Sequence, residues 1–416
     1  MRIYLETYGC TANKSDESII KGILTKEHHT IVTDSTQADI FILLTCTVID
    51  TTEQRMLSRL KTFQKTNKPI IVTGCMIPLQ QKTITTLIPN ARVLPPHYIH
   101  HINEILQQKE PEFIQRNKTM LPKQFTGTIA PIAIAEGCLQ NCSYCITQFT
   151  RGTLHSYPRE EILSDIKNAQ HQGCKEIQLT AQDTASYGLD TGDNLGNLIK
   201  DVTGLPGEFR VRIGMMNPYT LKKNLDTILP VYNAPKLYAF LHLPIQSGDD
   251  DILQKMNRKY TVNEYLTLVD QFRRNHLTLT LATDIIIGFP TENDTQFNNT
   301  ITLIKNIQPD ITNITRYSAR PFTTAKTMKG RIPTEIVKQR STQITHLCRT
   351  ISTRKNKEHI GKHYTILITE HGKKNTMMGR AENYKPVIIN EQLPLGTLAP
   401  VEITSSAPTH LFGKLI

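Results

Sequence analysis

Short apolar segments alternate with amphipathic segments along most of the chain, and this alternation restricts the folds that it can form. The first array comprises predicted strands Arg2–Tyr8, Asp39–Leu44, Pro69–Thr73 and Ala91–Leu94, with predicted helices Ser15–Leu24, Thr52–Lys65 and Leu79–Leu87 between them. Strands that alternate with helices in this way form a parallel sheet covered by helices. We therefore predict an α/β protein that begins with a doubly wound parallel sheet, a domain over residues 1–106.

A second array of the same kind follows a polar, irregular stretch, 106–124, that suits a linker. Its predicted strands are Ile129–Ala135, Glu176–Thr180, Phe209–Ile213, Tyr238–Leu243, Leu281–Ile287 and Ile311–Tyr317, and its helices are Arg159–Gln172, Leu195–Val202, Leu221–Leu229, Val262–Arg274 and Asp294–Ile307. These strand–helix units predict a partial or full (β/α)6-like parallel barrel as a central domain over residues 124–355. The functional site of such a barrel belongs at the carboxyl ends of its strands.

The last part of the chain, residues 356–416, changes to short strands separated by turns. The predicted strands are Tyr364–Glu370, Thr376–Ala381, Lys385–Ile389, Leu398–Ser405 and Thr409–Ile416. They predict a small all-β barrel of five strands, an architecture that often binds nucleic acid.

Three of the eight cysteines, Cys138, Cys142 and Cys145, follow the first predicted strand of the barrel in a C-x3-C-x2-C spacing. Thiolates this close can hold one iron–sulfur cluster, while their short loops disfavour disulfides between them. The alternatives are a zinc ion completed by His155, or reduced structural thiols. Zinc sites usually pair two C-x2-C knuckles, and the sequence has no second knuckle. The spacing therefore favours a cluster, and three ligands for a four-iron cubane leave one iron free.

Cys10, Cys46 and Cys75 each follow a predicted strand of the N-terminal sheet directly. Parallel strands end at one edge of their sheet, so these cysteines should converge there. A buried cysteine alone is usually a small hydrophobic residue. Three in the same topological position predict a second three-thiolate metal site, and Gly9 and Gly74 would let the backbone approach a cluster closely. The remaining two, Cys174 and Cys348, match no ligand position and are interpreted as plain thiols.

Turns at the carboxyl ends of the barrel strands supply candidate cofactor contacts. They include Tyr144 within the cysteine loop, Gln182 after the second strand and Gly288 after the fifth. An iron without a protein ligand at this face can chelate the amino and carboxylate groups of S-adenosylmethionine. Reductive cleavage of that cofactor yields a 5'-deoxyadenosyl radical, which can take hydrogen from an unactivated carbon.

The formal net charge of +11 favours a polyanionic partner. Much of it lies in residues 329–357, which hold eight Lys or Arg against one Glu. Such a run is often only a solvated helix face, but its concentration predicts a contact with a phosphate backbone. The chain opens with a predicted strand instead of a signal peptide, and it has no apolar run of membrane-spanning length. We expect a soluble, cytoplasmic protein with reduced thiols and no membrane contact.

With these residues considered together, the sequence resembles the radical-SAM methylthiotransferase family over essentially its whole length. The similarity rests on the stretches Gly9–Asn13, Glu136–Gly152, Leu243–Gly248 and Thr283–Pro290. It implies one [4Fe-4S] cluster on Cys10, Cys46 and Cys75, and a second on Cys138, Cys142 and Cys145 that binds S-adenosylmethionine. It also implies a TRAM-type C-terminal barrel that binds tRNA, and an electron donor such as flavodoxin or ferredoxin.

The stretches Leu179–Gly188 and Arg212–Pro218 are similar to the archaeal and eukaryotic branch of this family. That branch implies methylthiolation of N6-threonylcarbamoyladenosine at position 37, in the anticodon loop of tRNA. Phe322 and Thr324 stand where the family pattern has Gly and Pro. Arg151 and Arg320 are candidate contacts for a substrate phosphate or the cofactor, with salt bridges as the alternative.

Competing functions come from two classes. The enzyme alternatives are methylthiolation of isopentenyladenosine in tRNA, or of an aspartate in a ribosomal protein. The other alternative is a non-catalytic iron–sulfur protein that binds RNA and senses redox state.

Overall fold

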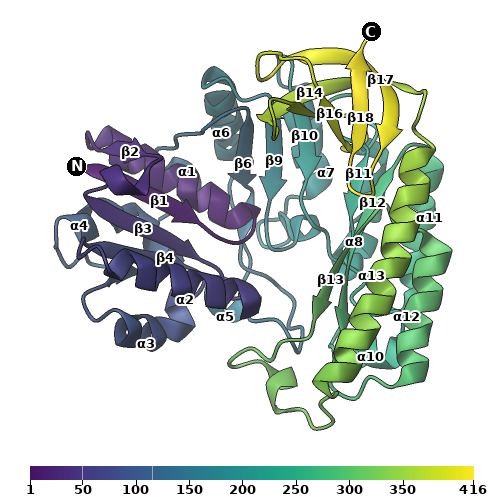
Figure 1. Ribbon diagram of the computed structural model, residues 1–416, viewed down its shortest axis with the longest axis horizontal. Helices are drawn as coiled ribbons and strands as arrows, with labels where there is room; N and C mark the ends of the chain where they lie inside the picture. The colour runs from purple at the N-terminus through teal and green to yellow at the C-terminus, as the bar shows by residue number, and fades with distance from the viewer. Residues whose placement is uncertain (49, 115) are drawn as a thin grey trace.

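The N-terminal part of the protein is a five-stranded parallel sheet with helices on both faces (Figure 1). The computed structural model describes residues 1–48, 50–114 and 116–416. The strands are β1 (Arg2–Thr7), β2 (Thr30–Val32), β3 (Ile40–Thr45), β4 (Ile70–Gly74) and β5 (Arg92–Leu94), in the order β2-β1-β3-β4-β5. The helices are α1 (Thr11–Lys26), α2 (Asp50–Gln64), α3 (Ile77–Leu87) and α4 (Ile102–Leu106).

Strand β3 shows why helices cover both faces of this sheet. All six of its residues are buried. Ile40 and Ile42 pack with α1 and α4, whereas Phe41 and Leu43 pack with α2 and α3. Successive strand side chains point to opposite faces, so a continuous apolar strand needs a helical layer on each side. The predicted doubly wound sheet is confirmed. Its edge strand β2, of three residues, is not among the predicted strands.

The central part is an open half-barrel of six parallel strands. These are β6 (Ile129–Ala133), β9 (Glu176–Thr180), β10 (Arg210–Ile213), β11 (Phe240–His242), β12 (Thr280–Ile287) and β13 (Ile311–Arg316). They form two sheets, β10-β9-β6 and β11-β12-β13, which a parallel bridge between Val211 and Leu237 connects. The partial form of the predicted barrel is therefore the one observed.

Helices cover the outer face of the half-barrel. They are α6 (Arg159–His171), α7 (Leu195–Gly204), α8 (Pro218–Lys223), α9 (Leu225–Ile228), α10 (Asp250–Lys255), α11 (Val262–Asn275) and α12 (Asp294–Ile307). The single helix predicted at 221–229 is in fact α8 and α9. Asn224 separates them, with φ −111° and ψ 15°, and its side-chain amide donates to the carbonyls of Ala185 and Thr220. Asparagine commonly interrupts helices through such competing hydrogen bonds.

The stretch 106–124, predicted as a linker, is irregular but firmly held. Lys118 is buried, and its Nζ lies 2.8 Å from carboxylate oxygens of both Asp16 in α1 and Glu136. Lys123 is also buried and lies 2.9 Å from Asp165 in α6. This stretch is therefore fixed to both neighbouring parts of the chain and does not behave as a free tether.

Helix α13 (Thr334–Lys357) carries most of the predicted basic segment and runs along the half-barrel beside α12 (Figure 1). Two of its cations are used internally: Arg340 pairs with Glu292 at 2.9 Å and Lys355 with Asp310 at 2.6 Å. The other basic residues of the segment are exposed, namely Lys329, Arg331, Lys338, Arg349, Arg354 and Lys357. The predicted phosphate-contacting surface is thus smaller than the sequence suggested, because two of its charges stabilise the fold.

The C-terminal part is a closed barrel, as predicted. Its strands are β14 (His363–His371), β15 (Met377–Arg380), β16 (Pro386–Ile389), β17 (Leu398–Ser406) and β18 (Leu411–Leu415), in the order β14-β15-β16-β18-β17. The backbone N–H of Ala239 donates to the carbonyl of Glu382 at 2.9 Å, which attaches the barrel to the half-barrel. Among the described residues, no helix combines the length and hydropathy needed to cross a membrane.

His359, just after α13, should make stability depend on pH. Its Nδ1 lies 2.5 Å from the hydroxyl of Tyr364. Burial, reinforced by the charges of Lys385 and Lys362, lowers the pKa of His359 from 6.5 to about 4. Below about pH 6.5 this histidine binds a proton in the unfolded chain but not in the folded protein. The contribution of His359 to the free energy of unfolding is therefore complete above that pH and falls as the pH drops toward about 4.

Urea unfolding at pH 7 and pH 5 measures this contribution of His359. The decrease in unfolding free energy between the two pH values should be smaller in His359→Asn than in the parent protein. The exposed His363 provides the control, since His363→Asn should keep the parental pH dependence; an equal loss in His359→Asn would contradict the expectation.

Candidate metal centre

Cys138, Cys142 and Cys145 lie in the loop between β7 (Ala135–Glu136) and α5 (Thr147–Arg151), beyond the carboxyl end of β6. Each sulfur accepts an N–H group. The donors are the backbone of Gln140 to Cys138 at 3.3 Å, the guanidinium of Arg258 to Cys142 at 3.3 Å, and the backbone of Thr147 to Cys145 at 3.4 Å. Such donors stabilise negative charge on sulfur and tune cluster potentials. This loop is thus prepared to hold three thiolates.

Arg258 is a residue of this site that the sequence did not reveal. It follows α10, and its Nε also donates to the Tyr260 hydroxyl at 2.8 Å while its Nη2 donates to the Pro244 carbonyl at 3.3 Å. Within the stretch Asn257-Arg258-Lys259 it looks like an ordinary surface cation. Its partner Cys142 is 116 positions away in the sequence, so no local pattern could have indicated the contact.

Cys10, Cys46 and Cys75 stand together at the carboxyl edge of the N-terminal sheet, as predicted. Cys46 and Cys75 are buried and Cys10 is exposed. Gly9, with φ +105°, faces Cys46 so closely that a Cβ atom would lie 2.9 Å from the Cβ of Cys46. Gly74, with φ +95°, would place a Cβ 2.5 Å from the Thr45 carbonyl oxygen. Both positions require glycine for the strand ends to approach one another.

One cysteine of each set shows the effect of burial on its thiol. Burial raises the pKa of Cys138 to about 12 and that of Cys46 to about 11, so in the absence of metal both are neutral thiols near pH 7. Metal binding at either thiol must therefore release a proton. In the described part of the chain, no three His, Cys, Asp or Glu side chains are already arranged around one ion position.

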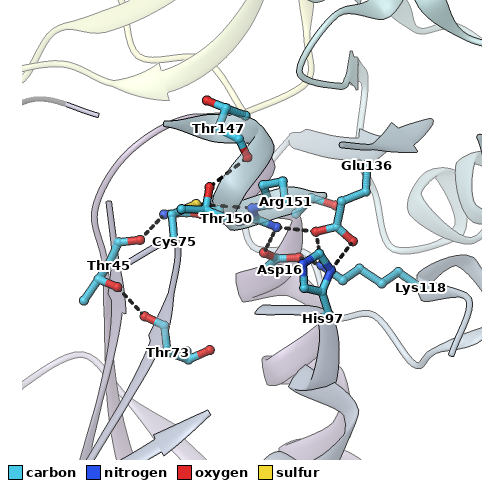
Figure 2. Close-up of polar contacts among 12 residues, drawn as sticks. Asp16, Thr45, Thr73, Cys75, His97, Lys118, Glu136, Thr147, Thr150 and Arg151 are labelled. Carbon is cyan, nitrogen blue, oxygen red and sulfur yellow. Dashed lines mark hydrogen bonds and ion pairs between the residues drawn. The ribbon is translucent and has the colours of Figure 1, made fainter. Parts of the chain in front are cut away.

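Arg151 joins the helix that follows the cysteine loop to Cys75 of the N-terminal sheet (Figure 2). This buried side chain on α5 donates through Nε to the Cys75 sulfur at 3.2 Å. Its Nη1 lies 2.8 Å from Asp16 and 2.6 Å from Glu136, and its Nη2 lies 2.6 Å from the Asn13 amide oxygen. The alternative of a salt bridge is thus the correct one for Arg151, because its guanidinium is fully engaged and cannot meet a substrate phosphate.

The Glu136 carboxylate pairs with both Arg151 and Lys118 and so offsets part of their positive charge. Figure 2 shows its carboxylate between Arg151, Lys118 and His97. Burial alone would raise the pKa of Glu136, but Lys118, His97 and Arg151 outweigh that effect and hold the pKa well below its ordinary value. The carboxylate therefore stays charged and keeps the ion pairs that join α1 to the half-barrel.

Arg320 makes the corresponding connection on the other side of the N-terminal sheet. It follows β13 and is buried, with Nη2 donating to the Thr47 hydroxyl at 3.0 Å and to the Glu53 carboxylate. Thr47 directly follows Cys46. Arg320 too is therefore a salt-bridge residue, and the two arginines hold the edge of the N-terminal sheet against the half-barrel.

Phe322, where the family pattern has glycine, has φ +65° and is 63% exposed. A bulky residue in the left-handed region is uncommon and strained. Its ring lies 6.3 Å from that of Phe149 on α5. Residue 322 therefore has a backbone conformation that glycine adopts easily. Its ring forms an exposed aromatic pair with Phe149 beside the cysteine loop.

The three predicted cofactor contacts differ in their surroundings. Tyr144, within the cysteine loop, packs against a small apolar cluster that includes Phe289. Gln182 follows β9, and its buried Oε1 has no hydrogen-bond partner among the described residues. Gly288 donates its N–H to Glu292 at 3.0 Å, and a Cβ there would lie 2.5 Å from Val337 of α13. Gly288 is thus packed closely against α13, and the roles of all three residues as cofactor contacts stay predictions.

Asp183 joins two of the predicted turns. Its Oδ1 accepts the backbone N–H of Asn217 at 2.9 Å and of Ala185 at 3.2 Å, and its Oδ2 accepts the Thr220 hydroxyl. Burial raises its pKa to about 6. These bonds fix the loops that follow β9 and β10 at the same end of the half-barrel as the cysteine loop.

Three family models match successive parts of the chain. Residues 2–94 match the uncharacterized protein family UPF0004, residues 132–304 the Radical SAM superfamily, and residues 357–416 the TRAM domain. The radical S-adenosylmethionine methyltransferase TsrM from Kitasatospora setae has a similar fold, with a TM-score of 0.58 at 11% identity over 78% of this chain and 75% of that chain. The fold and the matched superfamily define a radical S-adenosylmethionine enzyme, a class that uses a [4Fe-4S] cluster and S-adenosylmethionine.

Relatives that match this chain along nearly its whole length identify the family within this class. The chain is 40% identical over 433 residues to the "Probable threonylcarbamoyladenosine tRNA methylthiotransferase" of Pyrococcus abyssi, covering 100% of both chains. It is 30% identical over 431 residues to the human threonylcarbamoyladenosine tRNA methylthiotransferase, covering 99% of this chain and 74% of the human one. The chain therefore belongs to the threonylcarbamoyladenosine tRNA methylthiotransferase family.

Proposed function

We propose that the protein transfers a methylthio group to C2 of N6-threonylcarbamoyladenosine at position 37 of tRNA. The observation that carries this proposal is the hydrogen bond from Arg151, on the helix that follows Cys145, to Cys75 of the other cysteine set. One set lies at the mouth of a radical-SAM half-barrel, and Arg151 joins the segment that carries it to the N-terminal sheet that carries the other. A radical reaction at a base and the delivery of sulfur need two such groups side by side. Similarity over the full length to enzymes named for this reaction supports the same conclusion.

The residues divide into two ligand sets. Cys138, Cys142 and Cys145 would hold the [4Fe-4S] cluster that binds S-adenosylmethionine, and Cys10, Cys46 and Cys75 would hold a second [4Fe-4S] cluster. When bound, S-adenosylmethionine and its cluster supply a 5'-deoxyadenosyl radical, which takes hydrogen from the adenine carbon. The inner face of the half-barrel adds polar groups above this mouth.

Three of these polar groups form one hydrogen-bonded set. Asp284 accepts from the His242 ring, 3.0 Å from its Nε2, and from the Asn313 amide at 2.7 Å. The pKa of Asp284 is lowered, because His242 and Asn313 outweigh the effect of its burial. These side chains would orient a base that enters the half-barrel, with the carboxylate remaining an acceptor.

The RNA would meet the exposed cations of the 329–357 segment and the C-terminal barrel. These six Lys and Arg residues lie on and before α13, which leads directly into β14. Cations on such a surface bind phosphates without regard to sequence. They would hold the anticodon stem-loop, while the half-barrel selects the base.

The deciding experiment is mass spectrometry of tRNA nucleosides from a strain that lacks the gene. We expect the 2-methylthio derivative of N6-threonylcarbamoyladenosine to disappear, with its precursor retained, and to return when the gene is restored. Restoration with a Cys142→Ala gene should fail, since that variant lacks one ligand of the radical-generating cluster. Loss of methylthio-isopentenyladenosine instead would replace the proposed substrate. Unchanged nucleosides, with no reductant-dependent cleavage of S-adenosylmethionine by the purified protein, would favour the redox-sensing alternative.

A further inference from the structure

A cavity of ≈ 480 Å³ opens where the three parts of the chain meet. Its walls are α1, the inner face of the β10-β9-β6 sheet, and the C-terminal barrel. Lys14 and Lys21 of α1 line one side, Gln178 and Arg212 the second, and Arg380 and Tyr384 the third. Lys14 lies one helical turn from Cys10, to whose carbonyl its N–H donates at 3.3 Å. One wall of the cavity is therefore part of the helix that begins directly after Cys10.

Arg212 is a cavity residue whose guanidinium has no acidic partner in the described structure. It is paired with Gln178 across the parallel sheet, so both side chains project from the same face. Its guanidinium carbon lies 5.2 Å from the centre of the Phe240 ring and 5.4 Å from that of Tyr384. Stacking satisfies the faces of the guanidinium but not its N–H groups. Its Nε is buried and has no acceptor, and the described residues offer this side chain no hydrogen bond or ion pair.

The charges around Arg212 make the cavity positive. The Glu17 carboxylate forms an ion pair with Lys21, whose Nζ lies 2.6 Å from Oε1. Glu370 is the nearest acid to Arg380, at 3.8 Å, and the buried Nε of Arg380 also has no acceptor in the described structure. Neither carboxylate is paired with Arg212. A buried N–H donor on a charged group is costly to leave unpaired, and a guanidinium matches the two oxygens of a carboxylate or phosphate.

We propose that this cavity binds an anionic group of the RNA substrate, with Arg212 as its principal ligand. The inference rests on the proposed function and goes further, since it names a recognition residue in the half-barrel. Two groups of a modified tRNA have the required chemistry: the carboxylate of the threonylcarbamoyl substituent and a backbone phosphate. On the same wall, the Gln178 amide and the Tyr384 hydroxyl donate to the buried Glu176 carboxylate at 2.6 Å and 3.1 Å, so the unpaired N–H groups offered to a ligand are those of Arg212.

Binding measurements on the full-length protein without S-adenosylmethionine test this site. The probes are one tRNA bearing N6-threonylcarbamoyladenosine at position 37 and the same tRNA with adenosine there. We expect Arg212→Gln to weaken binding of the modified tRNA by about ten- to a hundred-fold, as for a lost charged hydrogen bond. Arg212→Lys keeps a charge that can stack but loses the two-pronged geometry, so it should recover only part of the affinity. The control is Arg274→Gln on α11, an exposed arginine paired with Asp270, which should bind both RNAs as the parent does.

The two RNAs separate the two anions. A loss confined to the modified tRNA assigns the carboxylate. An equal loss for both, with the salt dependence of binding reduced by about one phosphate contact, assigns a backbone phosphate. Unchanged affinity for both RNAs in Arg212→Gln and Arg212→Lys, at parental melting temperatures, would overturn the site. If the Arg212→Gln protein does not fold, RNA binding by the Arg212→Lys protein decides whether the site exists. A protein that binds through Arg212 but forms no methylthio product would overturn the proposed function and leave this site standing.

Discussion

Cys142→Ala should form no 5'-deoxyadenosine, whereas Cys46→Ala should form it at the parental rate and yield no methylthiolated tRNA. The two cysteines belong to different sets, one at the half-barrel mouth and the other at the edge of the N-terminal sheet. Loss of Cys142 removes one of the three cysteines proposed to hold the radical-generating cluster, together with the acceptor of the Arg258 N–H. Loss of Cys46 leaves that loop intact. The measurement is chromatography of the products after reduction with dithionite, with t6A-bearing tRNA and S-adenosylmethionine present.

Cys348→Ala is the matched control for both variants. Cys348 is a buried thiol of α13 outside either set, so its removal should preserve both products. Iron content gives an independent reading: after anaerobic reconstitution, each of the two ligand variants should hold about half of the iron of the Cys348→Ala protein. Parental iron content in Cys46→Ala, together with methylthiolated product, would refute the two-cluster arrangement.

Arg151→Met should be the most destabilising single substitution at the junction between the N-terminal sheet and the half-barrel. Methionine fills much of the same volume but leaves Asp16 and Glu136 buried, with Lys118 shared between them and His97 beside Glu136. Breaking a buried ion pair from one side typically costs about 3–5 kcal/mol. Urea unfolding of the metal-free protein measures this loss without any contribution from cluster binding.

Arg159→Met is the appropriate comparison. Arg159 pairs with Asp193 at 3.4 Å and Asp201 at 3.1 Å, but its side chain is 38% exposed. A solvated pair of this kind contributes about 1 kcal/mol or less. Equal unfolding free energies for the two variants would mean that the Arg151 pairs contribute no more than surface ones.

The sequence was most informative where structure depends on local pattern. Strand β9 and helix α12 have the predicted bounds, Glu176–Thr180 and Asp294–Ile307, because clear alternation or a cap marks their ends. Both cysteine sets lie where strand ends in a parallel sheet must bring them. These features follow from chain geometry within one or two strand–helix units.

Contacts across long sequence separations could not be predicted in the same way. Arg258 and Lys118 look like surface cations, and only the fold brings them to Cys142 and Glu136. For the same reason, the sequence around Arg151 is compatible with either a phosphate contact or a salt bridge. Whether a cation faces solvent or a buried acid depends on packing between distant segments, and a single sequence carries no local sign of it.

The stretch 106–124 acts as a strut. Lys118 pairs with Asp16 of α1 and with Glu136, and Lys123 pairs with Asp165 of α6, so residues 118–123 are anchored to both neighbouring parts of the chain. We therefore expect the protein to set the spacing of the two cysteine sets before RNA binds. The anticodon loop would then be the partner that changes shape on binding.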